Sequence, residues 1–248
     1  MTRARLIRAV AVVASLLLVA SACSDDGSDV NDVRAFNEML AERAPTWATP
    51  TSAVVVVDHF TWFVPETHSL DGIHPTAEGE EQMAQRWVTA VQQQLGAPTD
   101  QPVRVMPLGD STTDDYTRYQ TWQKMVEAGY TVDFVGTQTS IPLSREGNTP
   151  DVNGLPFDQD HEGHSAWAAS DMLAGHDDHP EEGNIEDWVQ QVDADVVLLH
   201  IGTNDIGRLG TAPRLVVDRT SRFVFQILQA MPDATIFVAQ ITPLGSEK

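Results

Sequence analysis

The sequence predicts an α/β fold of three layers, in which a five-stranded parallel sheet lies between two layers of helices. Five short apolar runs, rich in β-branched residues, are separated by segments with helical periodicity. Nearly continuous apolar runs are typical of parallel strands that are covered on both faces. Strands that alternate with helices favour a parallel sheet. The length of 248 residues suits one domain with a short leader.

The apolar runs have the length and composition of buried strands. The first contains four consecutive valines, and the fourth reads ADVVLLHIG. The five strands are expected at 52–59, 103–110, 130–137, 194–202 and 234–241.

Helical spacing of apolar residues marks the segments between these strands. The expected helix faces lie at 33–40, 83–95, 122–126 and 215–231. Thr76 precedes the second helix and is expected to cap it. The segment 138–183 is rich in Gly, Pro, Asp and His and has little periodicity, so we expect long functional loops there.

The charge of the chain restricts its partners. Lys and Arg total 15 and Asp and Glu total 36, which gives a net charge of −21. Such a chain repels nucleic acid and anionic membrane surfaces, and a neutral substrate such as an acylated sugar suits it better than an anionic one. A role of the charge in solubility alone explains it equally well.

The first 22 residues have the features of a secretory signal. Basic residues precede the short apolar run 9–20, which is too short to cross a bilayer comfortably. Segment 20–23 reads ASAC, and the arrangement resembles a bacterial lipoprotein signal in which Cys23 becomes lipid-modified. Ordinary signal cleavage beside an incidental cysteine is the alternative. We expect a signal peptide at 1–22, an acidic tether at 23–32, and secretion, with a lipid anchor on the outer face of the membrane if Cys23 is modified.

The first strand of the core, 103–110, ends in a Gly-Asp-Ser turn that carries Ser111. A serine at the carboxyl edge of a parallel sheet is well placed for nucleophilic attack. The helix that follows presents backbone N–H groups to a developing oxyanion. An N-cap role for Ser111 is the competing interpretation.

Three further segments carry chemistry. Asn204 follows a buried strand and has an amide that can donate to an oxyanion, although it can also simply form a turn. Asp71 and His74 lie three residues apart and can serve as orienting carboxylate and general base, which a serine nucleophile requires. Gly163 lies in HEGHS and can bring a backbone N–H close to a substrate oxygen.

Other histidines and tryptophans point to structure. The run HDDH at 176–179 has metal-ligand residue types, but its spacing falls short of a zinc site, so no metal is expected. His200 lies inside an expected strand, where we expect a core histidine whose polar atoms are satisfied. Trp167 and Trp188 are expected to pack in the core rather than stack on a sugar.

Together these segments resemble the blocks of the SGNH (GDSL) hydrolase superfamily: GDS, the glycine of HEGHS, GTND and DGIH. The wording VRVMPLGDSTT, VDFVGT, DHEGHSAW and VVLLHIGTNDI is similar to acetylxylan esterases of carbohydrate esterase family three. The resemblance covers nearly all of 31–248 and implies a flavodoxin-like fold. It implies Ser111 as nucleophile, His74 as base and Asp71 as its orienting partner. The oxyanion hole would consist of the Ser111 N–H, the Gly163 N–H and the Asn204 amide.

The order of the blocks departs from the family, in which DGIH comes last. Here the segment 33–97 supplies a helix, a strand, DGIH and a final helix before the part that carries GDS and GTND, 103–248. We interpret this as a circular permutation within one domain, 33–248, with the old ends joined by the linker 98–102. A tandem fusion of truncated copies, with exchange of the DGIH histidine between chains, is the rival interpretation. Permutation predicts the spatial strand order 130–137, 103–110, 194–202, 234–241 and 52–59.

The N-terminal signal predicts secretion, and the resemblance implies a serine esterase that hydrolyses short-chain acyl esters through an acyl-enzyme and needs no cofactor. Its expected partner is a small acyl ester or an acetylated polysaccharide such as acetylxylan, with no nucleic acid and no membrane contact beyond the lipid anchor. A short-chain arylesterase or lipid esterase is one alternative. Acyl transfer to a sugar and a glycan-binding lipoprotein without turnover are others.

Overall fold

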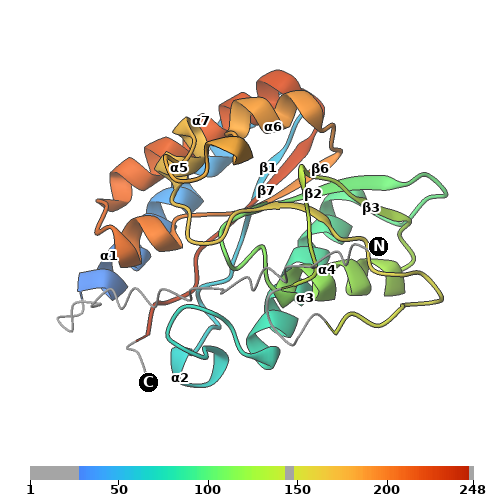
Figure 1. The fold of residues 1–248 in the computed structure, drawn as a ribbon, viewed down its shortest axis with the longest axis horizontal. Coiled ribbons are helices and arrows are strands. Elements are labelled where there is room, and N and C mark those ends of the chain that lie inside the picture. The colour runs from blue at the N-terminus through green and yellow to red at the C-terminus, as the bar shows by residue number, and fades with distance from the viewer. Residues whose placement is uncertain (1–27, 143–147, 246–248) are drawn as a thin grey trace, which may run out of the picture.

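A computed structural model describes residues 28–142 and 148–245 of the chain. Its parallel sheet runs through the centre of the molecule (Figure 1). The five principal strands are β1 (Val54–Val57), β2 (Val103–Gly109), β3 (Val132–Phe134), β6 (Val196–His200) and β7 (Thr235–Ala239). They lie side by side in the order β1-β7-β6-β2-β3, and every neighbouring pair is parallel. The expected strand positions and their spatial order are confirmed.

Two short strands add to this sheet within the segment that was expected to form only loops. β5 (Asp160–Gly163) pairs in parallel with the end of β2, and β4 (Gln138–Thr139) pairs antiparallel with β5. β3 pairs with the first half of β2, so β5 occupies the space beyond it along the same strand edge. The expectation of irregular structure throughout 138–183 is therefore wrong, because pairing with β2 imposes strand geometry on the polar run DHEG.

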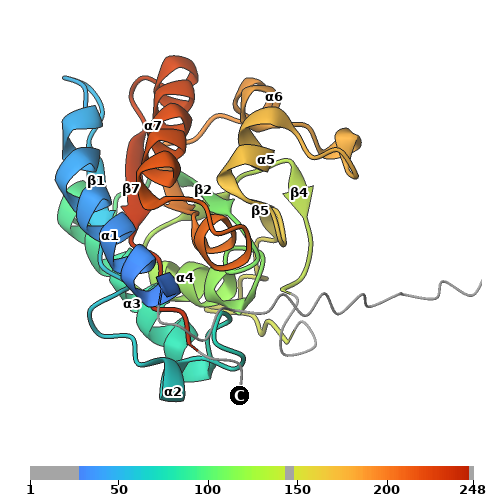
Figure 2. The ribbon, with the colours of Figure 1, turned by 90° about the vertical axis from the view of Figure 1, so that its left-hand side faces the viewer.

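Helices cover both faces of the sheet (Figures 1 and 2). One layer contains α1 (Ser28–Arg43), α5 (Ala169–Ala174), α6 (Ile185–Gln191) and α7 (Pro213–Ala230). The opposite layer contains α3 (Ala77–Leu95) and α4 (Tyr116–Glu127). Short helices complete the chain: α2 (Pro65–His68), η1 (Ala44–Trp47), η3 (Pro180–Glu182) and η4 (Asn204–Arg208).

The two layers enclose two hydrophobic clusters, one on each face of the sheet. In β6, Val197 and Leu199 belong to the cluster beneath α1 and α7, whereas Val196 and Leu198 belong to the cluster beneath α3 and α4. This alternation follows from the strand geometry, which points successive side chains to opposite faces. All four side chains are buried, which explains why the strand sequence is almost continuously apolar.

Helix boundaries agree with the sequence signals in the main. Thr76 is the N-cap of α3, where its side chain accepts the Gly79 N–H, as expected. α1 begins at Ser28, inside the segment 23–32 that was expected to be a tether. The expected signal peptide, Cys23 and the start of the tether lie outside the described residues. Among the described helices, none combines the length and the apolar character that crossing a bilayer demands.

Candidate active site

The register of the sheet brings three of the sequence-predicted segments to one edge. Gly109, the last residue of β2, pairs with His200 of β6 on one side and with Gly163 of β5 on the other. Ser111 follows β2 directly, and Asn204 follows β6 as the first residue of η4. The serine turn, the glycine strand and the asparagine therefore meet at the carboxyl end of the sheet, where α/β active sites lie.

The turn that carries Ser111 is held by the preceding aspartate. The buried Oδ1 of Asp110 accepts the Thr112 N–H at 3.0 Å, and its carbonyl accepts two further N–H groups of the turn. The helix α4 begins only at Tyr116, with Asp115 as its N-cap. Ser111 is therefore not the helix cap, and its side chain remains available for another role.

His74 and Asp71 complete a hydrogen-bonded chain to this serine. Nε2 of His74 lies 3.0 Å from Oγ of Ser111, and Nδ1 lies 2.7 Å from Oδ2 of Asp71. Oδ1 of Asp71 accepts the backbone N–H groups of Ile73 and His74 at 2.9 and 2.7 Å. Because the carboxylate accepts the proton on Nδ1, Nε2 of a neutral His74 is left as the acceptor of the serine hydroxyl proton.

The surroundings of His74 and Asp71 favour the charged forms of both side chains. Burial opposes ionisation of Asp71, but hydrogen bonds from the His74 ring and from two backbone N–H groups outweigh it and lower the pKa of Asp71. The hydrogen bond to Asp71 raises the pKa of His74 against its partial burial, and the nearby carboxylates of Asp115 and Asp110 add to the effect. The site therefore stabilises an imidazolium, the form that His74 takes after it accepts a proton.

The three candidate oxyanion donors differ in their present partners. The Ser111 N–H forms no hydrogen bond within the described part of the chain. The side-chain amide of Asn204 donates one N–H to the carbonyl of Trp167 at 3.0 Å, which leaves its second N–H. The Gly163 N–H donates to Nδ1 of His161 at 2.9 Å. Two donors are thus available at once, and the third is engaged by a neighbouring ring.

Gly163 has no room for a side chain. A Cβ at this position would lie 2.7 Å from the backbone nitrogen of Asp114 in the serine turn. Only glycine therefore lets β5 approach the nucleophile turn so closely. Gly163 therefore lies against the turn that carries Ser111, and its role as an oxyanion donor stays a prediction.

His161 of β5 contacts Ser140, which follows the neighbouring strand β4. Its ring is buried, and Nε2 lies 2.9 Å from Oγ of Ser140, which in turn donates to Asp114 at 3.3 Å. Burial, with the charge of Arg118, lowers the pKa of His161 to about 2, so the ring is neutral. Since Nδ1 accepts the Gly163 N–H, the proton resides on Nε2 and is donated to Ser140.

His164 lies in a stack of aromatic rings beside the site. Its ring stacks against both Trp167 and Trp188, with centroid distances of 4.5 and 4.3 Å. Nε2 lies 2.7 Å from Glu162 and Nδ1 lies 2.8 Å from Glu182. Both tryptophans are buried, so the expectation that they pack in the core is confirmed.

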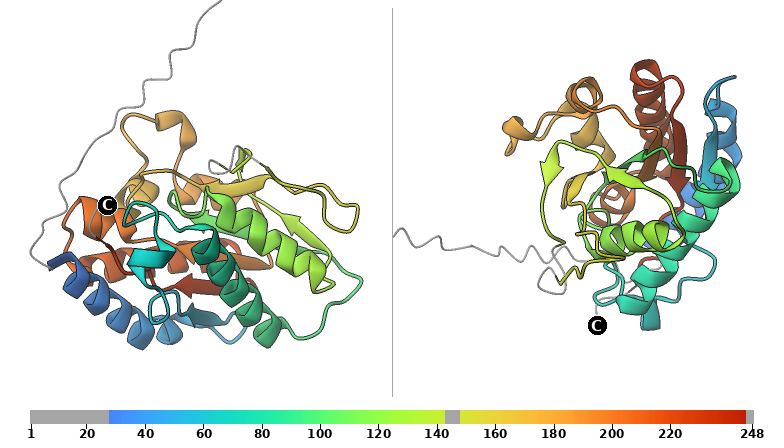
Figure 3. Two further views of the ribbon diagram at one scale, coloured as in Figure 1. Left: turned by 90° about the horizontal axis from the view of Figure 1, so that it is seen from below. Right: turned by 90° about the vertical axis from the view of Figure 1, so that its right-hand side faces the viewer.

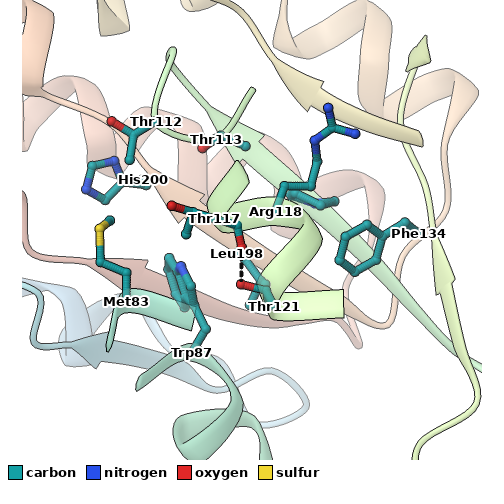
Figure 4. A pocket seen from close by; sticks show the side chains of 11 residues that line it. Met83, Trp87, Thr112, Thr113, Thr117, Arg118, Thr121, Phe134, Leu198 and His200 are labelled. Carbon is teal, nitrogen blue, oxygen red and sulfur yellow. Dashed lines mark hydrogen bonds between the residues drawn. The ribbon is translucent and has the colours of Figure 1, made fainter. Parts of the chain in front are cut away.

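A small cavity of about 20 Å³, enough for about one water molecule, lies beneath the serine turn, between the sheet and helices α3 and α4. Figure 4 shows the His200 ring at its edge beside Thr112. Neither Ser111 nor His74 lines this cavity, so it is not where a substrate would react. Both ring nitrogens of His200 are buried without a hydrogen bond among the described residues. The expectation of a satisfied core histidine is therefore wrong: Oδ1 of the buried Asp110 lies 3.9 Å from Nδ1 of His200, beyond hydrogen-bonding distance.

Some residues of the site were not identified from sequence. Asp205 is buried and binds the Ala169 N–H at 2.7 Å and Arg219 at 2.8 Å, which joins η4 to α5 and α7. Burial raises the pKa of Asp205 even though both partners favour its charged form. Its position next to Asn204 suggested only a turn. Arg208, four residues after Asn204, gave no sequence signal at all.

The acidic loop near 176–182 holds residue types that ligate metals. Ligand atoms of His179, Glu181 and Glu182 lie within 4.8 Å of one another. His179 and Glu181 are exposed, and exposed acidic groups of this kind occur widely without an ion. The arrangement assigns no metal to the reaction at Ser111.

Comparison with known families matches the part of the chain that carries the serine. A model of the GDSL-like lipase/acylhydrolase family matches residues 108–248, more than half of the chain. The matched segment includes Ser111, Gly163 and Asn204, whereas Asp71 and His74 precede it.

Individual proteins match over a similar extent. A multidomain esterase of Ruminococcus flavefaciens is 27% identical over 161 residues, which are 58% of this chain and 20% of that protein. A family 3 carbohydrate esterase from Talaromyces cellulolyticus is 32% identical, with a TM-score of 0.46, over 55% of this chain and 60% of that one. A family 3 carbohydrate esterase of Clostridium thermocellum is 32% identical, with a TM-score of 0.43, over 56% and 61%. The chain thus spans 20% of the length of the curated relative.

Proposed function

The chain belongs to the GDSL-like lipase/acylhydrolase family, and from this we propose that it is a serine carboxylic ester hydrolase. The observation that carries the proposal is the continuous chain of side chains from Ser111 through His74 to Asp71, with contacts of 3.0 and 2.7 Å. A weak nucleophile, a base within hydrogen-bonding distance and a carboxylate that orients the base are what acyl transfer requires. The name of the curated relative, a multidomain esterase, agrees with this reaction.

The first half of the reaction forms an acyl-enzyme. Nε2 of His74 accepts the hydroxyl proton as Oγ of Ser111 attacks the ester carbonyl, and Asp71 stabilises the resulting imidazolium. The negative oxygen of the tetrahedral intermediate accepts hydrogen bonds from the Ser111 N–H and the free N–H of Asn204. Gly163 joins as a donor whose N–H is shared between His161 and the oxyanion, a three-centre geometry that backbone N–H groups do adopt.

The second half releases the acid. His74 returns its proton to the leaving alcohol oxygen as the carbon–oxygen bond of the ester breaks. A water molecule then gives a proton to His74 and attacks the acyl carbon, and Ser111 leaves with that proton restored. The residues of this chain supply nucleophile, base and oxyanion donors, so we propose that no cofactor takes part.

We propose an acetylated neutral carbohydrate, such as acetylxylan, as the substrate. The wording of the motifs around Ser111, Gly163 and Asn204 is similar to acetylxylan esterases, and the net charge of −21 disfavours an anionic substrate. A short-chain aryl or lipid ester uses the same machinery. An acyl transferase would differ only in preferring a sugar hydroxyl to water as the acceptor. The hydrogen-bonded Ser111 and His74 argue against a glycan-binding protein without turnover.

We further propose that the domain is circularly permuted. The family match begins at 108 and leaves the base and its carboxylate outside, on the segment that precedes β2. β1 nevertheless lies beside β7 in parallel register, where a strand that followed β7 in sequence would lie. Figures 1 and 3 support the proposal, because the start of α1 and the end of the described chain lie on the same side of the molecule. The secretion signal and a lipid on Cys23 are likewise proposals, drawn from the sequence alone.

Hydrolysis of p-nitrophenyl acetate by residues 24–248, beside Ser111→Ala and Asn204→Ala, tests the function. We expect Ser111→Ala to lose on the order of a thousandfold or more, and Asn204→Ala roughly a hundredfold or more. Butyrate and octanoate esters and acetylated xylan, assayed in parallel, define the substrate. Preference for acetate and release of acetate from xylan would support the carbohydrate proposal. Wild-type turnover by a folded Ser111→Ala protein would overturn the assignment of the nucleophile.

A further inference from the structure

Two side chains of η4 hold consecutive carbonyls of the loop that follows β5. Arg208 donates from Nη2 to the carbonyl of Ala166 at 2.5 Å, and Asn204 donates from its side-chain amide to the carbonyl of Trp167 at 3.0 Å. Residues four apart in a helical segment lie on the same face, so both reach the loop from one side. The helix that carries the proposed oxyanion donor is thus attached to the loop at two adjacent points.

The backbone of the loop is strained at Ala166, the first of these two attachment points. Ala166 has a φ of 68°, in the left-handed region that residues with a side chain adopt only at a cost. Its carbonyl accepts from a guanidinium, a charged donor that forms stronger hydrogen bonds than a neutral one. Ser165, before it, donates to Asp114 at 3.0 Å, and the ring of Trp167, after it, stacks on His164. Of these contacts, the hydrogen bond from Arg208 is the one that reaches Ala166 itself.

The Trp167 carbonyl determines how the amide of Asn204 is oriented. A carbonyl only accepts hydrogen bonds, so it faces the NH₂ group of Asn204 and not its oxygen. With one N–H fixed there, the second N–H of the same planar group has a defined direction. A shift of the Trp167 carbonyl would rotate this group and move the second N–H away from the reacting carbonyl. Oxyanion stabilisation depends on donors that are aligned before the reaction.

We propose that Arg208 is a positioning residue of the oxyanion hole: by holding the Ala166 carbonyl it fixes the adjacent Trp167 carbonyl, which orients Asn204. This inference rests on the proposed role of Asn204. Arg208 makes no contact with Ser111, His74 or Asp71 among the described residues, so it acts on the rate through Asn204 and not through the base.

The test compares Arg208→Met with Arg208→Lys in steady-state hydrolysis of p-nitrophenyl acetate by the full chain. Methionine keeps the aliphatic stem and removes the donor, whereas lysine keeps a cationic donor on a flexible stem. We expect kcat to fall roughly ten- to hundredfold in Arg208→Met, the size that loss of a charged hydrogen bond implies, with KM unchanged and with partial recovery in Arg208→Lys. Arg222→Met is the matched control, because Arg222 is exposed on α7 and forms no ion pair among the described residues.

A double-mutant cycle separates a positioning role from a general one. If Arg208 acts through Asn204, adding Arg208→Met to Asn204→Ala lowers kcat no further. An equal loss in both backgrounds, a change in KM alone, or wild-type kcat in Arg208→Met would each overturn the inference. If Asn204→Ala by itself keeps wild-type turnover, the proposed oxyanion role of Asn204 fails instead. Circular dichroism and thermal unfolding of each variant exclude loss of the fold as the cause.

Discussion

At the scale of single residues, the proposed ester hydrolysis depends on how the carboxylate of Asp71 is held in place. Asp71 receives two backbone N–H groups and the His74 ring on its two oxygens, so the loop itself fixes the carboxylate before any substrate arrives. The short spacing between Asp71 and His74 makes this possible, because it lets one residue accept the backbone of the other while their side chains meet. Two residues named from a four-residue motif thus form one preorganised unit.

The raised pKa of His74 has a consequence for the pH profile. His74 must be neutral to accept the serine proton, so kcat/KM should rise with pH through a midpoint above 6.5, the ordinary value. In Asp71→Asn the hydrogen bond that contributes most to the raised pKa of His74 is altered, and we expect a lower midpoint together with a plateau reduced by on the order of ten-thousandfold. Asp133→Asn, which removes an exposed carboxylate on β3, is the control for general charge effects. An unchanged midpoint in Asp71→Asn would contradict the assignment of Asp71.

At the scale of secondary-structure elements, the principal strands could be predicted from the sequence, whereas the short strand β5 could not. The five principal strands were predictable, because burial on both faces leaves a continuous apolar signature such as VVLLH in β6. β5 was not predictable, since its residues DHEG carry no such pattern and their conformation follows from pairing with β2. Two features likewise depend on the register between distant segments: the ring nitrogens of His200 that form no hydrogen bond among the described residues, and the contact of Arg208 with Ala166.

The same β5 connects the site to the aromatic stack through His164. Its ring is 1% exposed and lies between Glu162, which is fully buried, and Glu182. Replacement by glutamine removes the buried ring that contacts both carboxylates and that stacks on two tryptophans. We expect His164→Gln to lower the free energy of unfolding by about 3 kcal/mol or more, because two hydrogen bonds to carboxylates and the packing of the ring are lost together.

Urea denaturation measures this loss as a lower midpoint at an unchanged slope. His179→Gln serves as the control, because His179 is exposed and contacts its glutamates at 3.7 Å, and it should change the free energy by less than about 0.5 kcal/mol. A loss below about 1 kcal/mol in His164→Gln would show that the stack is not a principal support of the loop.

For the whole molecule, the arrangement of the sheet is compatible with the proposed permutation. Ser111, the proposed nucleophile, follows β2 in the centre, while His74, the proposed base, lies on the segment between β1, at the edge, and α3 on the opposite layer. These positions depend on where each strand lies and not on the order in which the chain visits them. The motifs were therefore recognisable although their order was not that of the family, and the spatial strand order followed from assuming the permutation.

The permutation can be tested by reversing it. We expect a chain that starts at 101, continues to 248, passes through a short Gly/Ser linker to 31 and ends at 97 to fold and to hydrolyse p-nitrophenyl acetate within about tenfold of the parent rate. The fragment 101–248 is the control, since it lacks β1, α1, α3 and His74 and should neither fold nor hydrolyse esters. If the fragment were active, His74 could not be the base. If the reversed chain stayed unfolded while the parent chain was active, the ends would not be exchangeable. The position of DGIH before GDS would then need an explanation other than circular permutation.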